Sequence, residues 1–171
     1  AEDGIQANRP VIEGILKSGQ IDYRNFRAAL ACLDSLDGRN KPDRFNEKYA
    51  QPLLQSETTP ETLRANILRY FPDNHAAIDD RKLAEWITAK NPQLQREAIW
   101  KSRSHLTEST NLSLRKLALD AKAPLPLRLE ATAALGNSES PDTGTLVEIL
   151  QLKNPKLQAE ALRSLVGAHH E

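Results

Sequence analysis

The sequence predicts an all-α fold in which helical hairpins stack into an α-α superhelix. One sequence pattern returns four times between Thr58 and Gly167. The arginines of its first three copies, Arg64, Arg96 and Arg128, recur at a step of 32 residues (64 to 96 and 96 to 128). A period of this length is typical of stacked helical hairpins, each of which is too small to bury its apolar face alone. In addition, no stretch alternates apolar and polar residues over the length of a strand.

The composition is that of a globular protein with balanced charge. Of the 171 residues, 39% are hydrophobic and 27% are charged, and Lys+Arg and Asp+Glu both total 23. Because no basic run or stripe is visible, we expect no nucleic-acid partner. Because no apolar stretch approaches the roughly 20 residues that cross a bilayer, we expect no membrane-spanning segment.

The chain has a single cysteine and no methionine. One cysteine excludes an internal disulfide and a cysteine-based metal site. Cys32 falls between Ala29 and Leu33 on a predicted helix, which favours a small residue of the core. Without a methionine at its start, the chain is expected to be a processed or excised part of a longer protein.

Residues 1–57 are predicted to form irregular helices that pack on the array. A short helix spans Pro10 to Lys17, capped by Asn8 and ended near Gly19. A second helix opens at Asp22, and its apolar residues recur at three- and four-residue steps until Asp37-Gly38: Phe26, Ala29, Leu30, Leu33 and Leu36.

A third helix is predicted from Asp43, with Phe45, Tyr49 and Leu53 on one face and Pro52 kinking or closing it. The array then occupies residues 58–171, and we expect the two parts to form one continuous domain.

In the array, prolines and their preceding residues predict where second helices start. Thr58 or Thr59 would cap a helix with Pro60 at its first position, as Asn91 would for Pro92. Asp79 is predicted to start a first helix. Gly136 and Gly167 are predicted C-terminal caps. The matched alanines would let neighbouring helices approach closely: Ala98, Ala131 and Ala161.

The array unit resembles the HEAT repeat, which belongs to the armadillo-like repeat solenoids. In both, proline or Asn-Pro opens the second helix, and Arg, Glu-Ala and a terminal Leu-Gly follow, as in residues 127–136. The resemblance implies a superhelix that binds or scaffolds other proteins. HEAT repeats often carry an aspartate shortly before the arginine; Thr, Lys or Ala stands there in this chain, and the fourth copy has Ala159 in place of the arginine.

A narrower resemblance rests on residues 26–38, on Pro52-Leu53-Leu54 with Thr58-Thr59-Pro60, and on residues 69–75. These stretches are similar to a helical region of large exported proteins of planctomycetes. In those proteins the region lies between a dehydrogenase-like β-propeller and a c-type haem domain. The resemblance implies a periplasmic or exported location. The haem signature Cys-x-x-Cys-His and any propeller sequence are absent from this chain. The resemblance therefore implies neither haem binding nor dehydrogenase activity for these residues.

The candidate binding residues are Arg64, Arg96, Arg128 and Trp100. A ladder of arginines on the second helices could clamp acidic groups of a partner. The favoured alternative is that each arginine satisfies a helix end or a carboxylate of a neighbouring repeat. Trp86 lies in an apolar stripe and is predicted to be a packing residue, whereas Trp100 lies one residue past such a face and is predicted to be partly exposed.

The strongest cluster with metal-ligand chemistry consists of Asp73, His75, Asp79 and Asp80. The favoured interpretation is a connection between hairpins in which Asp79 caps a helix. We therefore expect no metal and no cofactor. For catalysis, Ser102, Ser104 and His105 are close in sequence, but sequence proximity does not make a nucleophile and base.

These observations predict a non-catalytic helical-repeat module for protein-protein interaction or scaffolding, whose partners are proteins or neighbouring domains of the same chain. Two alternatives stay open. One is a rigid spacer between a propeller and a haem domain in a redox protein. The other is a small metal-dependent hydrolase.

Overall fold

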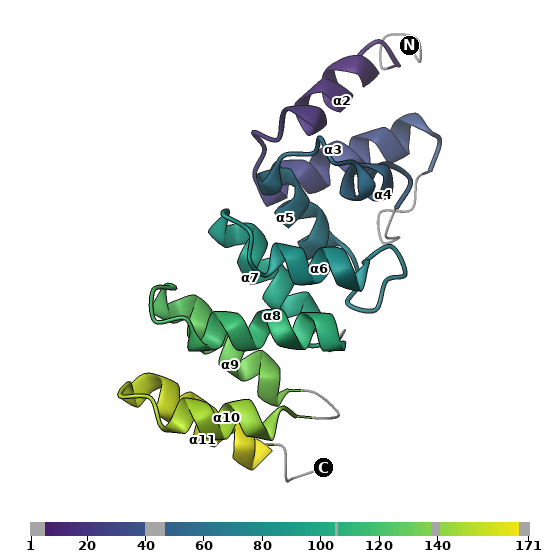
Figure 1. The fold of residues 1–171 in the computed structure, drawn as a ribbon. Helices are drawn as coiled ribbons and strands as arrows, with labels where there is room; N and C mark the ends of the chain where they lie inside the picture. Colours follow the sequence, from purple (N-terminus) through teal and green to yellow (C-terminus); the bar gives the residue numbers. More distant parts are fainter. Residues whose placement is uncertain (1–5, 40–46, 105, 138–140, 168–171) are drawn as a thin grey trace. The chain divides into compact units, whose positions relative to one another are not determined.

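The computed structural model describes residues 6–39, 47–104, 106–137 and 141–167. Within these ranges every regular element is a helix and no strand occurs, which confirms the all-α prediction (Figure 1). The helices are α2 Arg9–Ser18, α3 Tyr23–Leu36, α4 Glu47–Gln55, α5 Glu61–Tyr70, α6 Asp80–Trp86, α7 Pro92–Ser102, α8 Glu108–Leu119, α9 Leu125–Gly136, α10 Thr143–Leu150 and α11 Pro155–Gly167.

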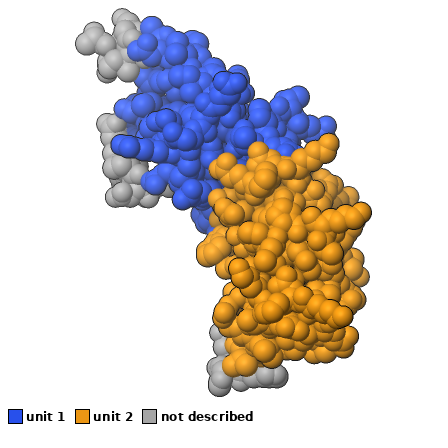
Figure 2. All heavy atoms as spheres, turned by 90° about the vertical axis from the view of Figure 1, so that its left-hand side faces the viewer, with its two compact units in different colours: residues 1–77 blue, residues 78–171 orange. Residues whose placement is uncertain are grey.

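The chain divides into two compact units, residues 1–77 and residues 78–171 (Figure 2). Unit 1 contains α2 to α5 and unit 2 contains α6 to α11. The sequence instead predicted N-terminal helices up to residue 57 and an array from residue 58, joined in one domain; that domain assignment stays a prediction.

Unit 1 is tied together where the chain passes from α2 to α3. In this unit α2 packs on α3, and α3 and α4 pack on α5. Gly19 ends α2 with a φ of 67°, a left-handed conformation that favours glycine. The Thr62 hydroxyl donates to the Gly19 carbonyl over 2.9 Å, and the Asn66 amide donates to the Ile21 carbonyl over 2.8 Å. These two side chains of α5 therefore hold the α2–α3 connection.

The predicted start of a helix at Asp22 is confirmed, whereas the helix predicted to start at Pro60 begins one residue later. Asp22 accepts a hydrogen bond from the Asn25 backbone N–H over 2.8 Å. Pro60 has a ψ of 143°, which is not helical, so α5 begins at Glu61 and Pro60 is its cap rather than its first residue. The predicted start at Asp43 and Phe45 lies outside the described residues. Pro52 lies inside α4, which continues to Gln55, so it does not end the helix there.

The prediction that Cys32 is a core residue is wrong, because its side chain is exposed. The buried residues of α3 are Phe26, Leu30 and Leu33. Each residue of an α-helix turns by about 100°. Cys32 is therefore rotated about 100° from its neighbour Leu33 and lies on the solvent side of the stripe.

Asp37 is the centre of a charged cluster in unit 1. Its carboxylate accepts from Arg9 Nη2 over 2.8 Å, from Lys48 Nζ over 2.5 Å and from the Tyr49 hydroxyl over 2.8 Å. Hydrogen bonds from Lys48, then Tyr49 and Arg9, hold the pKa of Asp37 well below its usual value. The cluster joins α2, the end of α3 and α4, since Arg9 also donates to the Tyr49 hydroxyl.

Unit 2 is built from three helical hairpins that stack in two layers. The hairpins are α6–α7, α8–α9 and α10–α11. The first helices contact one another in the order α6, α8, α10, and the second helices in the order α7, α9, α11. In Figure 1 the turns inside the three hairpins follow one another along one side of the unit.

Matched positions of the second helices form the core between hairpins. The third residues of α7, α9 and α11 are Leu94, Leu127 and Leu157, and all are buried. The seventh residues are Ala98, Ala131 and Ala161, each with 0% exposure. A small side chain at this position allows neighbouring helices to approach closely.

The prediction that Gly136 is a C-terminal cap is wrong, because Asn137 is the cap of α9. Gly136 is the last residue of α9, and the only positive φ values in the described chain belong to Gly19 and Gly38. A Cβ atom at position 136 would lie 2.3 Å from Ser164 Cβ of α11. Glycine is therefore required here by close helix packing. Gly167 likewise ends α11 without a positive φ, and a Cβ there would meet no atom within 4 Å.

We expect Gly136→Ala to lower the free energy of unfolding by roughly 1–3 kcal/mol, because the added methyl group overpacks the α9–α11 contact. Gly167→Ala is the matched control and should leave stability unchanged or slightly raised, since alanine is the better helix former. Thermal denaturation followed by circular dichroism measures both. The double variant Gly136→Ala/Ser164→Gly should recover part of the loss, and equal melting temperatures for the two single variants would show that the contact is not tight.

We expect Asp37→Asn to lower the urea midpoint of unit 1 at pH 7, because Arg9 and Lys48 lose their shared carboxylate. The folded-state pKa of Asp37 is depressed, so its stabilisation is present above the unfolded pKa, about 3.9, and is lost as pH falls toward the folded pKa. The difference between parent and variant should therefore shrink below pH 4. A difference that stays constant down to pH 2 would contradict an ionised Asp37.

Candidate functional site

Arg96 and Trp100, two of the four predicted binding residues, lie together on the solvent side of α7. The Arg96 side chain is 60% exposed, and its Nε donates to Glu130 Oε1 of α9 over 3.1 Å. Trp100 is 53% exposed, as predicted, whereas Trp86 is buried in the core, also as predicted. The two residues are four apart, so they share one side of the helix.

Arg103, the C-cap of α7, was not predicted as a binding residue and lies beside Trp100. Its guanidinium carbon lies 4.4 Å from the centroid of the Trp100 ring. This is within the range of a cation–π interaction. The sequence could have identified Arg103 by its position three residues after Trp100, because side chains three apart on a helix are neighbours.

Arg64 and Arg128 are directed toward backbone carbonyl groups. Arg64 belongs to unit 1, where its Nη2 donates to the carbonyls of Ser56 and Glu57 over 2.9 and 3.2 Å, just after the end of α4. Arg128 is only 8% exposed, and its Nε donates to the Ala118 carbonyl near the end of α8 over 3.0 Å. These contacts match the alternative in which the arginines satisfy helix ends.

The structure also corrects the repeat register that was built on arginines. Arg64 and Arg128 are the fourth residues of α5 and α9, and the fourth residue of α7 is Gln95 rather than Arg96. Gln95 Nε2 donates to the Ile87 carbonyl over 3.2 Å, and Gln158, fourth in α11, donates to the Leu150 carbonyl over 3.0 Å. These fourth positions are separated by 31, 33 and 30 residues (64 to 95, 95 to 128 and 128 to 158).

Two of the four residues with metal-ligand chemistry, His75 and Asp79, make local contacts. Asp73 and His75 belong to unit 1, and Asp79 and Asp80 belong to unit 2. His75 Nε2 lies 2.8 Å from Glu47 Oε2, and its Nδ1 accepts from the Ala77 backbone N–H over 3.1 Å. Asp79 caps α6 by accepting from the Lys82 N–H over 2.9 Å, as the favoured interpretation predicted. Among the described residues, no three His, Cys, Asp or Glu side chains are grouped so that they could hold a metal ion.

Of the residues considered for nucleophilic chemistry, Ser102 is buried and its hydroxyl donates to the Ile99 carbonyl over 2.7 Å. This bond closes the last turn of α7 on itself. Ser104 follows α7 and is exposed, and His105 lies outside the described residues. The Ser102 hydroxyl thus contributes to the end of the helix.

Comparison of the chain with protein-family models, with curated proteins and with solved structures gives no match. Across the described helices, none combines the length and the apolar character needed to span a bilayer.

We expect Arg128→Leu to lower the free energy of unfolding by about 1–3 kcal/mol, because it leaves the Ala118 carbonyl without its donor. Arg128→Gln should restore most of the loss, since glutamine makes the equivalent bond in α7 and α11. Arg96→Leu is the control and should cost at most about 1 kcal/mol, because its ion pair is exposed. Chemical denaturation of the three variants is the measurement, and equal losses for Arg96→Leu and Arg128→Leu would contradict the corrected register.

Proposed function

We propose that the chain is a non-catalytic, HEAT-like repeat module that binds another protein through the solvent side of the second helices of unit 2. The observation that carries the proposal is Trp100, a large aromatic side chain that is 53% exposed between two arginines. Tryptophan and arginine are the residues most enriched among those that dominate binding energy at protein interfaces.

The stacking of the hairpins supports the assignment to a HEAT-like α-α superhelix. Each hairpin of unit 2 contacts the next through both of its helices. The third, fourth and seventh residues of its second helices repeat one arrangement: a buried leucine, a donor to the preceding helix end and a buried alanine. Quasi-equivalent units of this kind build extended surfaces from matched positions.

The Trp100 face consists of Arg96, Trp100, Arg103, Leu129 and Ala133. Leu129 and Ala133 of α9 occupy the fifth and ninth helical positions, as Arg96 and Trp100 do in α7. Both are partly exposed, and α7 packs directly on α9. The face therefore offers an aromatic ring beside an aliphatic surface, edged by guanidinium groups, which suits the apolar side of a partner helix or segment.

A binding role also agrees with the chemistry of the candidate reactive groups. The Ser102 hydroxyl and both ring nitrogens of His75 are used in short local contacts. Such contacts stabilise helix ends and turns. They support a module without catalysis of its own.

Photocrosslinking tests the proposal in extracts of the cells that make the protein. We expect a benzoylphenylalanine in place of Trp100 to form a discrete protein adduct, because the face is a contact surface. The same probe at Leu112 is the matched control, since Leu112 is 58% exposed on the first-helix layer. The crosslinked protein, once identified by mass spectrometry, should bind Trp100→Ala at least tenfold more weakly than the parent and Leu112→Ala equally well. Adducts of equal yield at both positions, or no effect of Trp100→Ala, would contradict the proposal and favour a spacer.

A further inference from the structure

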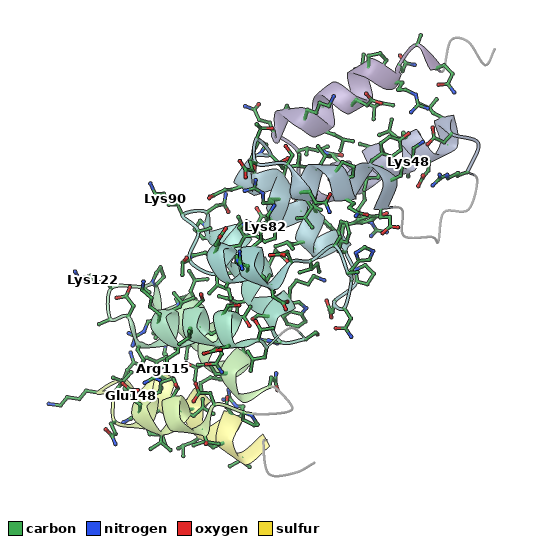
Figure 3. The ribbon with its side chains drawn as sticks, turned by 45° about the vertical axis from the view of Figure 1, so that its right-hand side comes forward. Lys48, Lys82, Lys90, Arg115, Lys122 and Glu148 are labelled. Atoms are coloured by element: carbon green, nitrogen blue, oxygen red, sulfur yellow. The ribbon has the colours of Figure 1, made fainter. Side chains whose placement is uncertain are left out.

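A lysine recurs in the turn inside every hairpin of unit 2. Lys90, Lys122 and Lys153 each stand two residues before a proline, in the turns that precede α7, α9 and α11. All three are exposed, as is Lys156 in the first turn of α11. Figure 3 shows Lys90 and Lys122 pointing away from their turns on the same side of the molecule. We call these four lysines the turn edge.

The lysines of the turn edge are exposed cations without an acidic partner among the described residues. None of the four forms an ion pair with a described residue, whereas other cations of unit 2 do. Arg96 pairs with Glu130, and Arg115 pairs with Glu148 over 3.1 Å in the first-helix layer (Figure 3). Unpaired cations in a row on one edge create a positive potential there.

The one acidic residue in these three turns is Asp120, which is held locally. Its Oδ1 accepts the backbone N–H of Lys122 over 2.9 Å, so the carboxylate closes the turn. Beneath this turn, Arg128 adds a guanidinium that is 8% exposed, donates to a backbone carbonyl and has no carboxylate partner among the described residues. The positive charge of the edge therefore exceeds the negative charge.

The stacking of the hairpins sets the spacing of these charges. Because α7 packs on α9 and α9 on α11, successive turns follow one another at about the distance between packed helices, roughly 8–10 Å. An extended peptide rises by about 3.3 Å per residue, so three residues span about 10 Å. One step of the turn edge thus corresponds to three residues of an extended chain.

We propose that the turn edge binds an extended acidic segment of a partner protein in which a carboxylate recurs at every third residue. Lys90, Lys122 and Lys153 would each face one carboxylate of a Glu-x-x-Glu-x-x-Glu pattern, and Lys156 adds charge at the last. The inference rests on the proposed function for the stacked repeats. It concerns a different surface, because Trp100 lies eight residues beyond the start of α7, about 12 Å along the helix.

An acidic peptide fits the edge better than a nucleic acid does. Single-stranded nucleic acids are bound by basic grooves in which aromatic side chains stack on the bases. The turns before α7, α9 and α11 contain no aromatic residue, and the chain as a whole has a net charge of zero. Four unpaired lysines suit a ligand with a few spaced charges.

Fluorescence anisotropy with labelled synthetic peptides tests the inference on the full chain at low salt. We expect a peptide with glutamate at every third position, separated by Gly and Ser, to bind at least fivefold more tightly than one in which the same glutamates are adjacent. Lys90→Glu/Lys122→Glu/Lys153→Glu should weaken binding of the spaced peptide at least tenfold, because three attractions become repulsions.

The matched control is Lys17→Glu/Arg24→Glu/Arg81→Glu, which changes the net charge by the same amount at exposed residues outside the three turns. It should change affinity less than twofold, and circular dichroism should show both triple variants folded. If the lysine variant unfolds, Lys90→Gln, Lys122→Gln and Lys153→Gln tested singly should each weaken binding about two- to threefold.

Three results would overturn the inference: no binding of the spaced peptide at 1 mM, equal loss in both triple variants, or tighter binding of an oligothymidine than of the spaced peptide. Trp100→Ala should leave peptide affinity unchanged. The proposal for the turn edge and the proposal for the Trp100 face can therefore be contradicted independently.

Discussion

The hairpins of unit 2 depend on donors for the carbonyl groups at the ends of their first helices. The last carbonyls of a helix have no partner within it, and burial without one costs about 1–3 kcal/mol each. Here the fourth residue of the following helix supplies the donor, from Gln95, Arg128 or Gln158. The bond fixes the axial position and the rotation of the second helix relative to the first. It thereby brings the buried leucine and alanine of each second helix to the interface with the next hairpin.

The features that the sequence predicted are those recorded by local periodicity and capping. The all-α class, the helices opened by Asp22, Asp79 and Asn91, and the exposure of Trp100 all follow from the residues near each position. What it could not predict depends on contacts between distant residues. Gly136 looked like a cap because it ends a helix, but its role comes from Ser164, which is 28 residues away (164 − 136).

The repeat register shows the same limit at the candidate site. Aligning the repeats on identical residues matched Arg96 to Arg64 and Arg128, because all three are arginines. The physical requirement is a side chain that donates a hydrogen bond over the distance to a helix end, and glutamine meets it as well as arginine. Because Gln95 occupies that position in α7, Arg96 is the fifth residue and lies on the solvent side beside Trp100. The turn lysines were not considered as binding residues from the sequence, because single exposed lysines in turns carry no local signal of a shared edge.

The aromatic and thiol side chains are distributed so that each unit carries its own spectroscopic reporter. Both tryptophans, Trp86 and Trp100, lie in unit 2, and the single cysteine, Cys32, is exposed on α3 of unit 1. Intrinsic tryptophan fluorescence therefore follows unit 2 alone, while a dye on Cys32 follows unit 1. A native chain with one labelling position can thus reveal whether the two units unfold in one cooperative step or in two.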